Sequence, residues 1–239
     1  MMYGLIIAAG KQSRFKSDVP KALMKFNDKT IVEHNIDILN KYCDNVFIVC
    51  SLENNSYFNQ FENKIIIESG KGSGDAIFRA IKTLNFSSDD SCIITWGDAI
   101  LNEKLVDYSI NRFKGYYCTI PCTFEKHPYV ELGHTIYNKK FVKFSKYGDN
   151  IGAGYHDQCL FICNLDELNK YLTKFYEKFY NEKEQKYYHK HGNEFEFLDV
   201  FNDTMYKFII VEVNSSLRTK TFNTLEELED IRKNENKGN

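Results

Sequence analysis

Short apolar runs alternate with amphipathic stretches through the first half of this chain. Runs of strand length, rich in isoleucine and other apolar residues, cover 3–9, 45–50, 64–67, 91–96 and 116–121. Between them, apolar residues recur at helical spacing over 30–39, 74–84 and 103–113. This alternation predicts a parallel sheet joined by right-handed crossovers, with helices on its faces. Ligands bind such sheets at the carboxyl ends of the strands, so we expect the functional site there.

The second half of the chain has a different pattern. We expect, in order, a hairpin over 131–144, a polar loop over 147–155, a strand over 157–163, a helix from Asp166, and closing strands over 208–213 and 217–222. The charged stretch 181–192 predicts an exposed end or flap in which His189 and His191 are solvated. Thr224 is placed to cap a last helix, with Glu227 completing a capping box.

No linker interrupts the 239 residues, so we predict one domain over 1–239, with approximate halves 1–125 and 126–239. Its class is α/β: a Rossmann-like, doubly wound, mostly parallel mixed sheet flanked by helices, with a smaller β-rich subregion in the second half. With 31 Lys and Arg against 33 Asp and Glu, the formal net charge is -2, which argues against nucleic-acid and membrane partners. Any phosphate chemistry must therefore use a local positive cluster.

The cysteines and the lack of long apolar runs bear on location. Seven cysteines occur, mostly inside apolar runs, as expected of reduced thiols. No run approaches the roughly 18 apolar residues of a membrane span. We therefore expect a cytoplasmic protein.

A local positive cluster follows the first apolar run. The run ends in the small residues 8–10, Ala-Ala-Gly, and the next eleven positions hold Lys11, Arg14, Lys16 and Lys21. Small residues let a nucleotide approach the backbone, and several cations can gather the charge of a triphosphate. Alone, the segment also fits a strand, a turn and a solvated basic loop. It contains neither a P-loop nor a dinucleotide-binding glycine motif.

Two further motifs favour the nucleotide interpretation. Residues 70–76, Gly-Lys-Gly-Ser-Gly-Asp-Ala, form a glycine-rich turn before a helix. The buried run 91–96 ends at Gly97 and Asp98, which puts a carboxylate at a strand end. A carboxylate there is suited to hold Mg²⁺ against phosphate oxygens, although Asp98 could instead cap the next helix.

Together these segments resemble the nucleotidyltransferases that make activated sugars and alcohols, whose signature is roughly LAAGxGxRxxxxxPK. The signature stands here at residues 7–14 and 20–21, with Gln12 in place of the second glycine. The resemblance implies a GT-A-like fold with an NTP-binding first half and an acceptor-binding second half. It implies catalytic roles for Lys21, Arg14 and Lys11, and Mg²⁺ as cofactor, held by Asp98.

The resemblance also implies the remaining site residues. Nucleotide-binding positions are Ala8, Ala9, Gly10, Ser69, Gly72, Ser73, Trp96 and Gly97. Acceptor-binding positions are Glu131, Gly133, His156, Asp157 and Asp199. Thr221 stands where a second acidic metal ligand is expected, so Asn223, Asp199 or a water is left for that place.

The implied activity is transfer of a nucleoside monophosphate, with CTP favoured, onto a phosphorylated small acceptor. The chain as a whole is similar to the enzymes that make CDP-L-glutamine from L-glutamine phosphate in capsule phosphoramidate biosynthesis. Phosphocholine or a sugar 1-phosphate, the latter with UTP or CTP, is an alternative acceptor. A non-catalytic nucleotide-binding regulator is an alternative hypothesis. A glycosyltransferase is another, which the lack of a DxD sequence at Asp98 makes less favoured. We expect a monomer or a homodimer.

Overall fold

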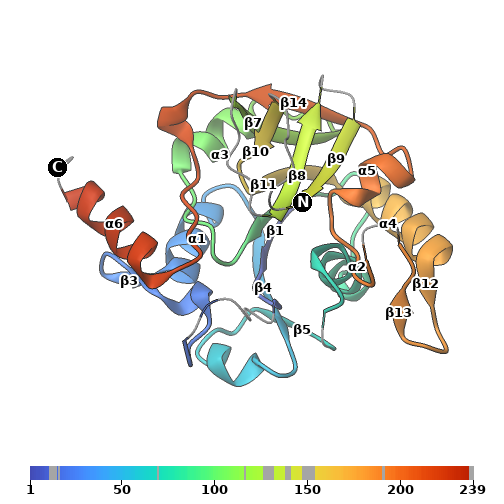
Figure 1. Ribbon diagram of the computed structural model, residues 1–239, viewed down its shortest axis with the longest axis horizontal. Coiled ribbons are helices and arrows are strands. Elements are labelled where there is room, and N and C mark those ends of the chain that lie inside the picture. Colours follow the sequence, from blue (N-terminus) through green and yellow to red (C-terminus); the bar gives the residue numbers. More distant parts are fainter. Residues whose placement is uncertain are drawn as a thin grey trace.

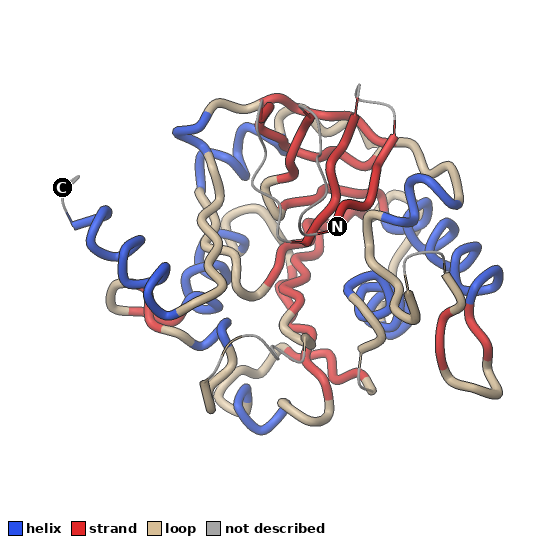
Figure 2. The backbone as a smooth tube through the Cα atoms, viewed as in Figure 1, coloured by secondary structure: helices blue, strands red, loops and turns tan. Residues whose placement is uncertain are grey.

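A mixed sheet with helices on both faces forms the centre of the computed structural model (Figures 1 and 2). The structure describes residues 1–10, 15, 17–68, 70–115, 117–125, 132–137, 141–146, 154–189 and 192–236. Its main sheet has ten strands in the order β5-β4-β1-β6-β11-β7-β10-β8-β9, and β14 pairs with β7. Among the described residues, no helix combines the length and apolar character that crossing a membrane requires.

The first half of the chain forms the parallel part of this sheet. Its strands are β1 (Met2–Ile7), β4 (Asn45–Ser51), β5 (Lys64–Ile67) and β6 (Ser91–Trp96). β1 pairs in parallel with both β4 and β6, and β4 pairs in parallel with β5. The predicted parallel sheet is therefore present, and its strands end along one edge.

The second half extends the sheet with strands of both directions. These are β7 (Cys118–Glu125), β8 (Leu132–Tyr137), β9 (Phe141–Lys146), β10 (Gly154–Asp157), β11 (Leu160–Asn164) and β14 (Phe208–Glu212). β11 is antiparallel to β6 and β7, whereas β14 is parallel to β7. β9, β10 and β11 run against the other seven strands. The predicted mostly parallel mixed sheet is confirmed.

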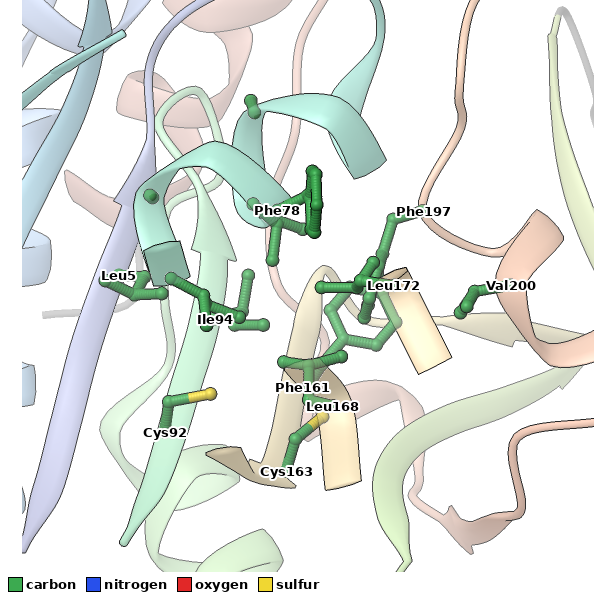
Figure 3. Close-up of a cluster of buried hydrophobic side chains, with 14 of the residues drawn as sticks. Leu5, Phe78, Cys92, Ile94, Phe161, Cys163, Leu168, Leu172, Phe197 and Val200 are labelled. Atoms are coloured by element: carbon green, nitrogen blue, oxygen red, sulfur yellow. The ribbon is translucent and has the colours of Figure 1, made fainter. Parts of the chain in front are cut away.

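Helices cover the two faces because successive strand residues point to opposite sides. Leu5 of β1 packs in a cluster with α2 (Ser73–Thr83) and α4 (Leu165–Phe179), and part of this cluster is shown in Figure 3. Its neighbour Ile6 packs with α1 (Ile31–Leu39) and α3 (Glu103–Ile110). The short helix α5 (Asp199–Asp203) joins the first cluster. The last helix, α6 (Leu225–Asn236), contributes Leu228 to a third cluster.

Short elements complete the described chain. They are the 3-10 turns η1 (Lys21–Leu23), η2 (Asn55–Phe58) and η3 (Ser215–Leu217), and the paired strands β2 (Lys25–Phe26), β3 (Lys29–Thr30), β12 (Tyr180–Asn181) and β13 (Lys186–Tyr187).

The helix caps follow the sequence closely. Thr30 and Glu33 form a capping box at α1, and Thr224 and Glu227 exchange the corresponding bonds at α6. Asn164 caps α4 by accepting from the backbone N–H of Glu167. The predicted cap at Thr224 is confirmed.

Two predicted strands were wrong, and the expectation for one further segment holds only in part. The strand expected over 157–163 is two strands, because Cys159 takes a left-handed φ of 56° between β10 and β11. The strand expected over 217–222 is absent: this segment holds the end of η3 and a single bridge between Lys220 and Ile100. Within the stretch 181–192, residues 182–185 are exposed as expected, but β12 and β13 form a hairpin in which Tyr187 is 0% exposed.

Candidate functional site

The carboxyl ends of β1 and β6 meet closely. Ile7 lies opposite Trp96, and the N–H of Gly97 donates to the Ile7 carbonyl over 2.8 Å. A Cβ on Gly97 would lie 3.0 Å from the Cβ of Ala8 and 3.2 Å from that of Ala22. Gly97 thus lets the loop after β6 pack directly on the loop after β1. This contact brings Ala8 and Asp98, which sequence placed in one site, to the same edge of the sheet.

Lys21 connects this edge to the end of the chain. Pro20, with φ of -54°, leads into η1, and the turn directs the Lys21 side chain inward until it is 9% exposed. Its Nζ lies 3.3 Å from Asp98 Oδ2 and donates to the Phe222 carbonyl over 3.0 Å. Three segments far apart in sequence therefore converge on one ammonium group.

Aromatic rings surround the same ammonium group. Nζ lies 5.5 Å from the ring centre of Phe15 and 5.6 Å from that of Phe222, and the two rings pack edge to face. Ring faces attract a cation, so the site holds a buried positive charge without full hydration. Asp98 is the more accessible partner, at 38% side-chain exposure.

The residues fit a divalent cation of the Mg²⁺ type. Asp98 supplies one accessible carboxylate, and magnesium takes one or two carboxylates together with phosphate oxygens and water. Asn223 follows Phe222 directly and is exposed. The two candidate metal ligands thus lie on the two segments that Lys21 joins.

The turn between β10 and β11 lies at the same edge of the sheet, because Leu160, the first residue of β11, pairs with Thr95 near the end of β6. Burial, together with the charges of Asp157 and Asp98, raises the pKa of the Cys159 thiol well above its usual range. Cys159 therefore lies within electrostatic reach of both carboxylates. Asp157 also accepts the Cys159 N–H over 2.9 Å, which fixes the turn.

His156 lies next to this turn. Its Nε2 is buried and has no hydrogen-bond partner among the described residues. Burial is the main cause that lowers the pKa of His156, because a low-polarity environment disfavours the charged ring. The structure thus brings His156 and Asp157 to the edge that also carries Asp98.

The glycine-rich loop 70–76 is packed against the second half of the chain. The N–H of Gly74 donates to the Phe195 carbonyl over 2.8 Å, and that of Phe195 donates to the Lys71 carbonyl over 2.7 Å. Gly72 has φ of 100°, and a Cβ there would lie 2.3 Å from the Phe195 carbonyl oxygen. The Ser73 hydroxyl donates to Glu196 over 2.6 Å and accepts from the Phe197 N–H. The contacts of Gly72 and Ser73 here are therefore within the protein.

Asp199 lies in a separate cluster on α5. His189 has Nδ1 3.5 Å from Asp199 Oδ2 and Nε2 3.1 Å from Asp203 Oδ2. The side chains of His189 and Asp199 are each 1% exposed. The expectation of a solvated His189 was wrong, because the imidazole lies between carboxylates and against the rings of Phe175 and Phe179.

The remaining predicted positions can be placed briefly. Trp96 packs on Phe161 and Phe197, with ring centres 5.4 and 6.3 Å away. Ala9 is buried and Gly10 is exposed at the end of β1. Gly133 lies in β8, paired with Ser145 of β9. Lys11, Arg14, Ser69, Glu131 and His191 lie outside the described residues.

Sequence reasoning missed Asn54 and Arg218. The Asn54 amide donates to the Ala8 carbonyl over 3.0 Å and accepts from Ser51, which ties the end of β1 to the end of β4. Arg218 forms an ion pair with Glu125 on β7. The asparagine gave no signal beyond a polar turn after a strand. The arginine lay in a segment that sequence expected to be a strand.

The fold is that of a Rossmann-like α/β protein, and the candidate site lies at the carboxyl ends of its parallel strands. A family model described as "MobA-like NTP transferase domain" matches residues 4–149, more than half of the chain. The chain therefore belongs to this family of NTP transferase domains.

Curated relatives are similar over parts of the chain. A 2-C-methyl-D-erythritol 4-phosphate cytidylyltransferase of Thermosipho africanus is 32% identical over 131 residues, covering 50% of this chain and 57% of the relative. A probable molybdenum cofactor guanylyltransferase of Thermococcus sibiricus is 28% identical over 148 residues, covering 61% and 73%. The chain thus spans a little over half the length of the first of these relatives.

Solved structures are similar over almost the whole chain. The inositol-1-phosphate CTP transferase of T. maritima superposes with a TM-score of 0.71 at 13% identity, covering 98% of this chain and 94% of that one. The CTP:phosphocholine cytidylyltransferase LicC of Streptococcus pneumoniae gives 0.67 at 12% identity, covering 97% and 98%. At these identities the likeness concerns the fold.

Proposed function

We propose that this protein is a nucleotidyltransferase that moves a nucleoside monophosphate from an NTP onto a phosphorylated small molecule and releases pyrophosphate. The observation that carries the proposal is the convergence of Lys21, Asp98 and the Phe222 carbonyl at the ends of β1 and β6. A buried cation beside an accessible carboxylate suits a triphosphate bound with its metal. The family to which the chain belongs and the names of its relatives support this class of reaction.

The chemistry requires positioning and charge neutralisation more than covalent work by the protein. An oxygen of the acceptor phosphate forms a bond to the α-phosphorus, and the bond from that phosphorus to the bridging oxygen breaks, so pyrophosphate leaves. Lys21 neutralises charge on the α-phosphate, and Lys11 and Arg14 bind the β- and γ-oxygens. A phosphate dianion is already nucleophilic, so no general base is needed.

Asp98, together with Asn223, would hold the Mg²⁺ ion. When bound, this ion neutralises triphosphate charge and orients its oxygens. The backbone at Ala8, Ala9, Gly10 and Gly97 lies at the same strand ends, where it can approach the nucleotide closely.

CTP is the favoured nucleotide and L-glutamine phosphate the favoured acceptor, giving CDP-L-glutamine. Several relatives are named as cytidylyltransferases, which supports CTP. The choice of acceptor rests on the overall resemblance of the chain to the group that makes CDP-L-glutamine. Asp157 and His156, at the end of β10 next to the turn that leads into β11, offer groups that could meet an ammonium or a hydroxyl of the acceptor.

A substrate panel tests the proposal. CTP, UTP, GTP, ATP and dTTP are each incubated with Mg²⁺ and with L-glutamine phosphate, phosphocholine or a sugar 1-phosphate, and pyrophosphate is measured. We expect release to require both substrates and to be fastest with CTP. NTP binding without pyrophosphate in any pair would instead indicate a nucleotide-binding regulator. Release of a nucleoside diphosphate from a nucleotide sugar would indicate a glycosyltransferase.

A further inference from the structure

We propose that Arg218 binds the phosphate of the acceptor and that Thr123 positions its guanidinium group. The inference rests on the proposed function and adds a residue to it. An acceptor phosphate must approach an edge that carries the carboxylate of Asp98 after β6 and that of Asp157 at the turn before β11, whose Leu160 pairs with Thr95 of β6. A cation on the acceptor side is needed to offset that negative charge.

The segment that contains Arg218 runs along this edge. At one end, the Phe222 carbonyl accepts from Lys21. In the middle, Lys220 and Ile100 bond to each other through both backbone groups, over 2.8 and 3.3 Å, only two residues beyond Asp98. At the other end, Arg218 reaches the carboxyl end of β7. Arg218 and Lys21 thus lie along one stretch of chain beside Asp98.

Contacts on β7 hold the guanidinium group in place. Its Nη2 donates to Thr123 Oγ1 over 3.4 Å and pairs with the carboxylate of Glu125. The Thr123 hydroxyl also accepts from Gln158 Nε2 over 3.1 Å and donates to Glu125 over 3.2 Å. A hydroxyl has one donor and two acceptor positions, and Thr123 uses all three, so the orientation of its hydroxyl group is fixed.

The hydrogen bonds of Thr123 continue to the turn between β10 and β11. Gln158 lies in the turn between β10 and β11, beside Asp157 and Cys159, and its side chain also bonds to the carbonyl of His156. Thr123 lies opposite His156 in the register of β7 and β10. Arg218 is therefore connected, through Thr123 and Gln158, to the turn between β10 and β11, at the edge of the sheet where β6 ends.

The exposure of Arg218 suits a ligand. Its side chain is 44% exposed, and the contacts with Thr123 and Glu125 both fall on Nη2. The planar fork of an arginine matches two oxygens of a phosphate, a geometry that a lysine cannot reproduce. An ion pair as exposed as the one with Glu125 contributes little net stability, so phosphate can replace the carboxylate at low cost.

Steady-state kinetics of Arg218→Ala, Arg218→Lys and Thr123→Val test the proposal, using the preferred substrate pair. We expect Arg218→Ala to raise KM for the acceptor at least tenfold while KM for the NTP stays within twofold. Arg218→Lys should recover only part of the loss, and Thr123→Val should raise the same KM less. Arg112→Ala is the matched control, because Arg112 lies on the surface against the ring of Tyr108. An acceptor KM within twofold of wild type in Arg218→Ala would overturn the inference.

A binding measurement separates this inference from the proposed function. If the wild type releases no pyrophosphate from any pair, the proposed function fails, but calorimetry with inorganic phosphate still tests the site. Loss of phosphate binding in Arg218→Ala, with binding kept in Arg112→Ala, supports a phosphate site at Arg218. Equal binding in both variants excludes it.

Discussion

At the scale of single residues, Lys21 is the side chain on which the segments of the candidate site converge. Burying an ammonium group is costly unless polar partners replace water. Here the Asp98 carboxylate, the Phe222 carbonyl and the rings of Phe15 and Phe222 replace it, and they come from three separate parts of the chain. The desolvation cost of burying this charge is understandable if the charge binds a ligand rather than only stabilising the fold.

Replacing Lys21 or Asp98 by alanine should lower turnover by orders of magnitude, because each removes a charge placed against the triphosphate. The measurement is pyrophosphate release under saturating substrates, with circular dichroism to confirm folding. The exposed pair of Lys29 and Asp37 supplies matched controls, since Lys29→Ala and Asp37→Ala remove the same charges on the surface. Near-normal turnover in Lys21→Ala or Asp98→Ala would contradict the proposed function.

Replacement by alanine should affect substrate binding at Gly10 and stability at Gly72. A Cβ on Gly10 meets nothing within 4 Å, so Gly10→Ala should leave the melting temperature nearly unchanged. We expect it to raise KM for the NTP severalfold, because the new methyl group occupies space beside the phosphates. Gly72→Ala should lower the melting temperature, since its Cβ would lie 2.3 Å from the Phe195 carbonyl oxygen. An unchanged KM for the NTP in Gly10→Ala would argue against nucleotide binding at that loop.

The pKa of His156 predicts a pH dependence of stability. Burial lowers this pKa below its ordinary 6.5, so the unfolded chain takes up the proton at a higher pH than the folded one. The free energy of unfolding should therefore fall as pH drops through 6.5 and level off below the folded pKa. Urea denaturation of wild type and His156→Gln between pH 5 and 8 isolates this contribution. The wild type should lose stability relative to the variant only in the lower part of that range.

Residue-level prediction succeeded where the chemistry follows a strand end and failed where tertiary packing decides. Asp98 could be expected beside the N-terminal loop because β1 and β6 end together. His189 could not, because its neighbours along the chain are polar while its partners, Asp199 and Asp203, come from α5. Asp75 is similar: it is 0% exposed and bonded to Tyr187, which lies 112 positions away.

At the scale of elements, local capping signals placed helix starts accurately. The Thr30 side chain accepts from the Glu33 N–H, and Glu33 accepts from the Thr30 N–H. Thr30→Ala should therefore lower the free energy of unfolding by about 1 kcal/mol, within a range of roughly 0.5–2 kcal/mol for lost caps. Urea denaturation measures this. Thr224→Ala removes the equivalent bond from α6, whose start is exposed, and should cost less.

Elements whose limits depend on one backbone conformation were harder to predict. Nothing in the residue types marks Cys159 as left-handed, yet this conformation divides one apolar run into β10 and β11. The direction change matters to the candidate site, because it brings the turn before β11 to the end of β6, where Leu160 pairs with Thr95. Over 217–222, the alternation typical of a strand instead reflects Phe222 packing inward while the backbone pairs only at Lys220.

At the scale of the whole molecule, the sheet runs without a break from the first half to the second. β11 pairs with β6 through five residue pairs, from Leu160 opposite Thr95 to Asn164 opposite Ser91. On one face, Phe195 of the second half packs on Gly74 of the first and stacks on Phe175 at 3.8 Å. The nucleotide-side loop is therefore supported by the half that is proposed to bind the acceptor.

This continuity predicts that the two halves unfold together. Trp96 is the single tryptophan, and its ring packs on Phe161 and Phe197 at the junction of the halves. Its fluorescence should change at the same urea concentration as the far-ultraviolet circular dichroism, which reports helices throughout the chain, since coincident transitions mark two-state unfolding. Phe195→Ala should move both curves together to lower urea concentration. The free energy of unfolding should fall by about 3–5 kcal/mol, the usual loss for a buried aromatic ring. If the fluorescence transition instead came clearly first, the junction would open before the halves unfold, and the one-domain prediction would be wrong.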